Sequence, residues 1–140
     1  MYVMMFGLMA IFLGFAIDSG MGFYTKNGMQ RSLDSAAVVG ANQTDYNGAG
    51  KKVINSERAT NAAINAFNDS KVNYPNLVNC NEKGECSKFS NMMVKTDPTR
   101  GQYYTITATI YSKNVFMHMV GLPVQKYTLK SEARLGYIQD

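Results

Sequence analysis

Few residues of this chain could perform chemistry, and the two cysteines are the clearest candidates. Cys80 and Cys86 are the only cysteines among 140 residues, and the segment NEKGE separates them. In a chain that also carries an apolar export segment, two close cysteines favour a disulfide that closes a short loop, in which Asn81 and Gly84 supply turn residues. A metal site is the alternative, but two sulfurs and one histidine cannot form a closed four-ligand zinc site. We predict a disulfide, with no metal and no cofactor.

The remaining candidates do not form a catalytic set. His118 is the only histidine, within VFMHMVG at 115–121. As a general base it would need a nucleophile and an orienting carboxylate, and no sequence signature supplies either. Gly20 and Gly22 do not form a nucleotide loop, because no GK[ST] follows and no strand precedes them. We therefore expect neither catalytic residues nor an enzyme.

The elements that position these residues begin with an apolar segment. Residues 1–17 read MYVMMFGLMAIFLGFAI and carry no charged side chain. As a helix they would be about 25 Å long, a little less than the ~30 Å hydrocarbon core of a bilayer. No Lys or Arg precedes the segment and no A-x-A-like cleavage site follows it, so we expect a basic leader to have been removed before Met1.

Charge is distributed differently from hydrophobicity. The chain has a net charge of +4 and a sequence pI near 9.1. The charges of residues 1–41 cancel, so the excess lies in residues 42–140, where Lys and Arg are spread without a run. A nucleic-acid-binding protein concentrates its basic residues on a stripe or patch. We therefore interpret the charge as a solvated surface and expect no nucleic-acid partner.

Helical spacing gives the apolar segment two faces. Gly7, Ala10 and Gly14 share one face, on which small residues would let another backbone approach closely. A plain membrane anchor, in which the glycines have no role, is the alternative. Asp18 ends the segment, and a lone carboxylate there is costly unless it reaches water or a partner. The candidate partners of the Asp18 carboxylate are headgroup water, the amine of Met1 and a basic residue of a neighbouring subunit. Large side chains stand on the opposite face: Met4, Met5, Phe6, Phe12 and Phe15.

The rest of the chain predicts a small α+β head. Turn residues predict a loop at 42–50, and SERATNAAINAF predicts a helix over 56–67, capped by Ser56 and ended by Asn68 and Asp69. Alternating apolar and polar residues predict antiparallel strands with one buried and one wet face. The domains expected are a hydrophobic spine helix over 1–41, in which Gly20, Gly22 and Gly28 could allow a bend, and a globular head over 42–140 with three or four strands. The remaining segments are an extended stretch at 71–80 and strands at 89–95, 103–111 and 126–137.

The segment AIDSGMGFYTKNGMQRSLDSAAVVGA at 16–41 resembles the N-terminal segment of TadE/TadG-like proteins, the pilin-like components of Tad (Flp-type) pilus systems. The end of the chain is similar too, with a Thr-rich strand at 103–111, a hydrophobic turn at 115–123 and a last strand at 126–137. The residues that match the family pattern are Ala16, Asp18, Gly20, Tyr24, Lys26, Gln30, Leu33, Asp34, Ala36, Ala37 and Ala41.

The resemblance implies a pilin-like chain, cut by a prepilin peptidase so that the mature protein starts with the apolar helix. Phe6 fits such a start. Met5 departs from the common pilin pattern, in which Glu neutralises a neighbour's N-terminal amine, and it suits the TadG-like branch.

Two functions follow as expectations. In the first, the chain is a structural subunit of an extracellular Tad/type IV pilus-like filament, stored in the inner membrane with its head in the periplasm. Copies of the chain would assemble through an assembly helix that includes Met1, Met5, Phe6, Gly7, Ala10, Gly14 and Asp18, with the pilus assembly machinery as partner. In the second, it is a membrane-anchored minor (accessory) pilin or an envelope protein that primes or supports assembly.

Overall fold

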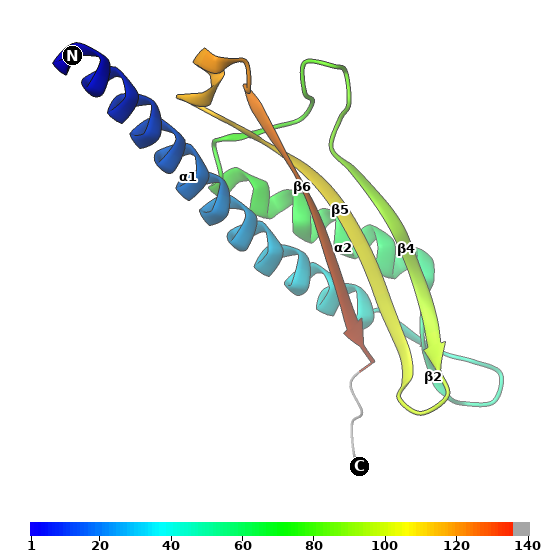
Figure 1. Ribbon diagram of the computed structural model, residues 1–140. Helices are drawn as coiled ribbons and strands as arrows, with labels where there is room; N and C mark the ends of the chain where they lie inside the picture. Colours follow the sequence, from blue (N-terminus) through cyan, green and yellow to red (C-terminus); the bar gives the residue numbers. More distant parts are fainter. Residues whose placement is uncertain (136–140) are drawn as a thin grey trace.

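A computed structural model describes residues 1–135 of the chain (Figure 1). It begins with α1 (Tyr2–Ala41), one uninterrupted helix of 40 residues. The helix has no break at Gly20, Gly22 or Gly28, where the sequence could allow a bend. Gly22 and Gly28 instead lie where the side chains of Tyr127 and Tyr74 reach the helix backbone so closely that a Cβ would collide with them.

The sheet is built around β5 (Gly101–Lys113). β6 (Val124–Arg134) pairs antiparallel with one edge of β5, from Tyr103 opposite Arg134 to Lys113 opposite Val124. β4 (Lys88–Asp97) and the short β3 (Leu77–Val78) share the other edge, also antiparallel. The predicted α+β class and the three long strands are confirmed. Tyr137, which we expected at the end of the last strand, lies outside the described residues.

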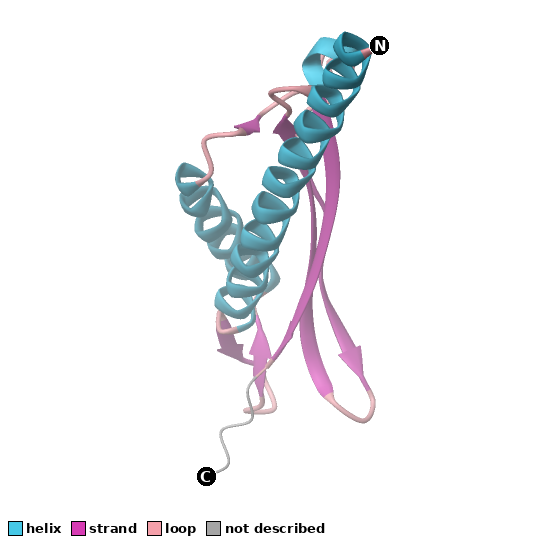
Figure 2. Ribbon diagram, turned by 60° about the vertical axis from the view of Figure 1, so that its left-hand side comes forward, coloured by secondary structure: helices cyan, strands magenta, loops and turns pink. Residues whose placement is uncertain are grey.

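Both helices lie on one face of this sheet, as Figure 2 shows. The second helix, α2 (Ser56–Ser70), packs beside the C-terminal half of α1. The alternation of 103–111 and of residues 126–135, the described part of the last predicted strand, directs one set of side chains toward the helices, as predicted. The buried core is formed by Met29, Leu33, Ala36, Ala37 and Ala41 of α1, by Ile54 of β2 (Lys52–Ile54), by Ala59, Ala63 and Phe67 of α2, and by Tyr104, Ile106, Ala108, Ile110, Leu129 and Ala133 of the sheet.

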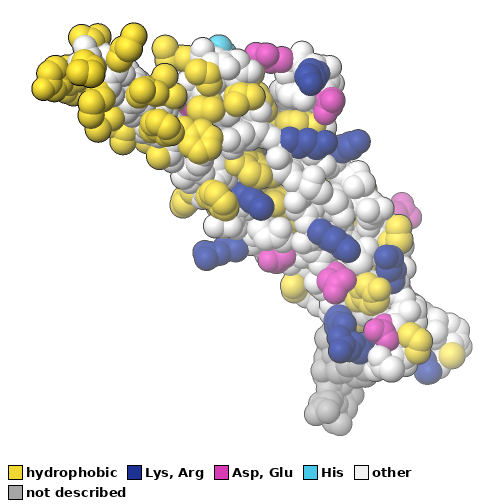
Figure 3. All heavy atoms as spheres, viewed as in Figure 1, with side chains coloured by type: hydrophobic (Ala, Val, Ile, Leu, Met, Phe, Trp, Pro, Cys, Tyr) yellow, Lys and Arg dark blue, Asp and Glu magenta, His cyan; other side chains and the backbone are white. Residues whose placement is uncertain are grey.

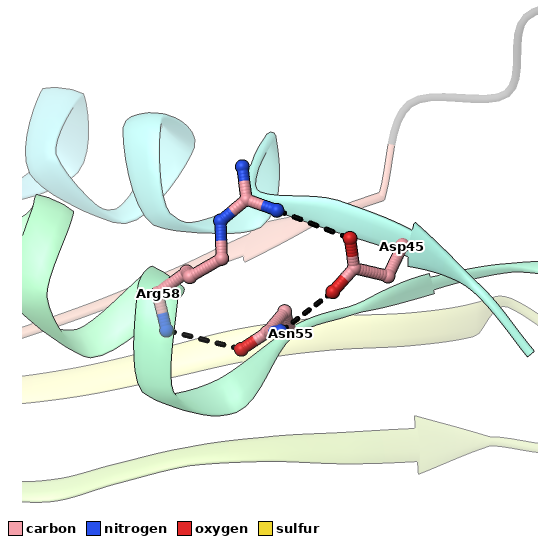
Figure 4. A network of polar contacts seen from close by, with 3 residues as sticks. All are labelled: Asp45, Asn55 and Arg58. Carbon is pink, nitrogen blue, oxygen red and sulfur yellow. Dashed lines mark hydrogen bonds and ion pairs between the residues drawn. The ribbon is translucent and has the colours of Figure 1, made fainter.

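The start of α2 differs from the prediction by one residue. Asn55, not Ser56, is the N-cap, and its Oδ1 accepts a hydrogen bond from the backbone N–H of Arg58 at 3.1 Å. Figure 4 shows how Asp45 completes this network by accepting from Asn55 Nδ2 at 2.6 Å and from Arg58 Nη1 at 3.0 Å. Asn55 occupies the N-cap position because two hydrogen bonds hold its side chain, one from the Arg58 N–H and one to the Asp45 carboxylate. The helix also continues past the predicted end, to Ser70.

Two segments expected to be irregular or extended have other structures. The predicted loop at 42–50 contains β1 (Thr44–Tyr46), which forms a hairpin with β2 (Lys52–Ile54). The start of the extended stretch at 71–80 is a 3₁₀ turn, η1 (Lys71–Asn73), that follows α2 directly.

The face of β5 that points away from the helices is more buried than predicted. Thr105, Thr109 and Tyr111 were expected to be wet, and all three are buried. β5 is the central strand, and side chains from the strands on its two edges cover it: β6 on one edge, and β4 and β3 on the other. A bulge in β4 brings the backbone of Asn91, with φ of +52°, within 3.0 Å of the Thr105 hydroxyl, which donates to its carbonyl oxygen.

Candidate assembly surface

The N-terminal half of α1 projects beyond the sheet and beyond α2, and apolar side chains gather on it (Figures 1 and 3). Its large side chains are exposed, with fractions of 81% for Tyr2, 74% for Phe6 and 69% for Phe12, and the predicted assembly residues Met1 and Met5 are exposed as well. The helix is long and apolar enough to cross a membrane, with a mean hydropathy of 1.8 in its apolar window. An apolar surface of this extent calls for a lipid or protein partner.

The predicted strip of small residues divides between two environments. Nothing lies within 4 Å of a Cβ placed on Gly7, and Ala10 is exposed. Gly14 is buried, because Phe116 of the same chain lies across it, with its Cβ 2.8 Å from where a Gly14 Cβ would be. In this structure the missing side chain of Gly14 thus accommodates the chain's own turn, at a position where the sequence predicted contact with another copy.

Asp18 also faces this turn and is only 2% exposed. Its Oδ1 accepts a hydrogen bond from the N–H of Val115 at 3.0 Å, and its Oδ2 accepts from Phe116 at 2.9 Å and Met117 at 2.5 Å. Such charge-assisted bonds compensate a carboxylate for lost water. In this structure three backbone amides thus replace the water or cationic partner expected from the sequence. The sequence does not indicate this pairing, because it joins residues almost 100 positions apart.

The turn held by Asp18 contains the 3₁₀ helix η2 (Met117–Val120), which is capped by Gly121 with a φ of +85°. We call residues 115–122 the apolar turn. Asn114 fixes its base by donating from its N–H to the Pro123 carbonyl at 2.8 Å and from Nδ2 to the Leu122 carbonyl at 2.9 Å. His118 is exposed on η2, in agreement with the expected short turn. The exposed apolar side chains of this segment are Val115, Phe116, Met119, Val120 and Leu122.

Further along α1, two residues of the family pattern bind β6. Gln30 Nε2 donates to the Lys130 carbonyl at 3.0 Å and to Asp34 Oδ1 at 2.9 Å. Asp34 in turn accepts a hydrogen bond from the Ser131 hydroxyl at 2.6 Å. Asp18, Gln30 and Asp34 thus all connect α1 to the C-terminal part of the chain. The segment at 16–41 and the end of the chain, which carry the family resemblance, are bound to each other.

A buried polar cluster that the sequence did not predict adds a third connection. Asn76 Nδ2 donates to Thr25 Oγ1 at 2.7 Å and to Ser112 Oγ at 2.9 Å, which links α1, the segment before β3 and β5. Thr25 and Ser112 are each about 1% exposed. Because buried hydroxyl and amide groups must be paired, this cluster favours one position of α1 against the sheet.

The predicted disulfide between Cys80 and Cys86 is present. Asn81 organises the loop between them: its Oδ1 accepts from the N–H groups of Lys83 at 3.0 Å and Glu85 at 2.8 Å, and Gly84 adopts a φ of +82°. The loop precedes β4, at the end of the sheet where the apolar turn lies (Figure 1). It is a crosslinked surface loop and not a metal site.

The outer face of the sheet, opposite the helices, collects positive charge, and Figure 3 shows these side chains along the sheet. Pairing places Tyr103 between Lys95 and Arg134, Thr107 between Ser90 and Lys130, and Thr109 between Lys88 and Thr128. The sequence separates these residues because alternate positions of a strand face opposite sides, so no run was visible. We call this surface the cationic face: Lys88, Lys95, Lys113, Lys126, Lys130 and Arg134. Its carboxylates are Glu132, Asp97, which shares this face through its pairing with Gly101, and Glu85, which accepts a hydrogen bond from the Tyr111 hydroxyl at 3.4 Å.

Titratable groups are not gathered into a reactive centre in the part of the chain that the structure describes. Across residues 1–135, no three His, Cys, Asp or Glu side chains are placed to hold a metal ion. Burial raises the pKa of the Tyr104 hydroxyl, which donates a hydrogen bond to Thr60 Oγ1 at 3.2 Å. Tyr104 therefore serves as a protonated structural donor in the core.

Neither a curated protein nor a solved structure matches the chain. Residues 1–43 match the family model Tad, described as putative Flp pilus-assembly TadE/G-like. These residues comprise α1 and its C-terminal end, the element that carries the projecting apolar surface and the contacts of Asp18, Gln30 and Asp34. The match confirms the resemblance over these residues, where the chain is similar to Flp pilus-assembly TadE/G-like proteins, and it supports a part in pilus assembly.

Proposed function

We propose that this chain is a structural subunit of an extracellular Tad/type IV pilus-like filament. In this proposal, the projecting halves of α1 from many copies form the interior of the filament, and the heads form its surface. Residues 1–41 act as the spine and residues 42–140 as the head. Before assembly the subunit resides in the inner membrane with its head in the periplasm. A prepilin peptidase has by then removed a leader, so that the mature chain starts with the apolar helix.

The observation that carries this proposal is the rigid attachment of an exposed apolar helix to a folded head. α1 continues without interruption from its exposed end into the core, where Met29, Leu33 and Ala36 are buried. Apolar side chains on the exposed end gain little by moving from lipid to other apolar helices, so close packing and paired polar groups must supply the gain. A rigid connection transmits the geometry of the helix bundle to the heads.

Gly7 and Ala10 remain available for such packing because the chain itself does not cover them. The opposite face carries large side chains, which in the proposed bundle fill the spaces between neighbouring helices. Met5 cannot neutralise a neighbouring N-terminal amine, so assembly would depend on packing more than on an ion pair at that position.

A membrane-anchored accessory pilin is the second candidate, and one observation favours it. Gly14, predicted on the packing face, and Asp18, for which a neighbouring subunit was one of three partners considered, both contact the apolar turn of the same chain. Less of the helix surface is then free to contact other copies. This suits an accessory component, which primes assembly at one end and needs fewer contacts with its neighbours than a repeated subunit.

Substitution of Gly7 tests the choice between these roles. Gly7→Leu should abolish filaments while leaving the head folded, because the site is open within the chain but would be closed by a neighbouring helix. Met9→Leu, on the opposite face of the same helix at two residues from Gly7, is the matched control and should assemble. Filaments sheared from cells are counted by electron microscopy and their subunit is identified by mass spectrometry.

The wild-type protein provides the other readout. Filaments in which this chain predominates support the structural subunit. Trace amounts confined to the membrane fraction would favour the accessory pilin, and normal filaments from Gly7→Leu would contradict packing through this face.

A further inference from the structure

The apolar turn, residues 115–122, has an unusual surface for an exposed connection between two strands. It contains no acidic residue, Lys or Arg, and Met119 at its tip is 86% exposed. Val120 and Leu122 are also more than half exposed. An apolar patch of this kind on a soluble surface marks a site of contact with a membrane or another protein.

The position of the turn along α1 is fixed. Asp18 holds its first three backbone N–H groups, and Phe116 lies on Gly14. The turn therefore lies beside the end of the uncharged part of α1. Its exposed side chains continue the exposed apolar surface of the helix, where Ile11 and Phe15 lie at the same level.

The length of the uncharged segment places this level at a bilayer boundary if α1 enters the membrane. Residues 1–17 span about 25 Å, and a hydrocarbon core measures ~30 Å. Asp18 then lies close to the head-side boundary of the hydrocarbon. Its three hydrogen bonds reduce the cost of that position, because the carboxylate does not depend on water there.

The backbone of the turn is also suited to lipid. Irregular backbone next to hydrocarbon must satisfy its polar groups internally. Six N–H groups of the turn are hydrogen bonded within the chain, three to Asp18 and three to carbonyl groups of the turn itself. These donors belong to Val115, Phe116, Met117, Met119, Gly121 and Leu122.

Basic residues flank the turn on both sides. Lys113 ends β5 and Lys126 lies near the start of β6, and both are exposed. Lysines at this height suit the anionic headgroups of a membrane surface, while the apolar residues between them suit the acyl chains.

We infer that the apolar turn is a second membrane contact, which inserts Met119 and its apolar neighbours into the head-side leaflet beside α1. It adds apolar surface at the level where the uncharged part of α1 falls short of the full hydrocarbon thickness. It also fixes the orientation of the head over the bilayer. This inference rests on the proposed function in one respect, namely that α1 resides in a membrane before assembly. Its ligand is the lipid bilayer, and a second copy of the chain is the rival occupant.

The test measures the depth of single labels in the full-length chain, reconstituted as one copy per nanodisc of phosphatidylethanolamine and phosphatidylglycerol. An environment-sensitive fluorophore is attached to Met119→Cys without reductant, which leaves the Cys80–Cys86 disulfide intact. Phe12→Cys reports on α1, and Met93→Cys is the matched control because it is an exposed methionine on the outer face of the sheet. Lipids with a doxyl quencher near the headgroup end of the acyl chain supply the readout.

Insertion predicts a blue-shifted Met119 label that these lipids quench several-fold more strongly than the Met93 label. Quenching at position 12 but not at 119 would overturn the inference and leave the proposed function intact. If neither position is quenched, α1 is not in the bilayer and the membrane premise of both proposals fails. Shielding of position 119 that requires several copies per disc, without quenching in single-copy discs, would assign the turn to a second copy and overturn the lipid contact.

Discussion

Phe116 lies directly on Gly14, so that the turn between β5 and β6 contacts the backbone of α1 through the Cβ and Cγ of one aromatic residue. A Cβ at position 14 would be 2.8 Å from the Cβ of Phe116 and 3.2 Å from its Cγ, both tighter than ordinary packing. These atoms lie near the backbone and cannot move aside as the end of a long side chain can. The glycine is therefore required by the fold of one chain, independently of any neighbour.

Gly14→Val should lower the free energy of unfolding by about 1–3 kcal/mol, because it overpacks this contact. Thermal or denaturant unfolding of the full chain in detergent measures the change. Gly7→Ala is the control: its site is open, and alanine is a better helix former than glycine, so stability should be unchanged or higher. Equal destabilisation by both substitutions would contradict the contact with Phe116 as the cause.

Asp18→Asn should release the apolar turn from α1. The asparagine side chain keeps one acceptor oxygen, but its amide group would face backbone N–H groups that now bind Oδ2, which leaves donors without an acceptor. We expect a loss of about 1–3 kcal/mol and faster hydrogen exchange at Val115, Phe116 and Met117. Asp69→Asn, on an exposed part of α2, should change neither quantity. Unchanged exchange in the Asp18 variant would show that these three bonds do not hold the turn.

Asp18 also illustrates what the sequence could and could not predict. The long apolar helix, the head class and the three main strands follow from hydrophobic periodicity, which is a local property. The partner of Asp18 is almost 100 residues away and consists of backbone amides, which have no sequence signature. The spacing of Gly7, Ala10 and Gly14 predicts a face suited to close approach, but the same spacing serves a neighbouring helix and the chain's own Phe116 equally well.

The cationic face was missed for a related reason. Lys126, Lys130 and Arg134 lie at even spacings on β6, and their neighbours across the sheet come from β4 and β5. A search for basic runs finds adjacent charges, whereas a strand places alternate residues on one side. Strand pairing was needed before the charges could be added together.

Loss of the disulfide should destabilise the head without changing its fold. Replacing Cys80 and Cys86 together by serine removes the restriction of a short loop in the unfolded chain, which is worth about 2 kcal/mol. The denaturant midpoint of the variant should match that of the wild type under reducing conditions. Asn81 retains its hydrogen bonds to the loop, so circular dichroism of the folded state should be preserved. Identical wild-type midpoints with and without reductant would contradict a stabilising crosslink.

The cationic face should dominate the binding of the protein to anionic supports. Lys126→Glu combined with Lys130→Glu reverses two charges within the face, whereas Lys51→Glu combined with Lys52→Glu makes the same change in net charge at the β1–β2 hairpin. Closely spaced cations reinforce one another's potential, so the first variant should elute from a phosphate-based cation exchanger at distinctly lower salt than the second. If both variants elute together, net charge alone controls retention, and the gathering of lysines on the sheet has no effect on binding.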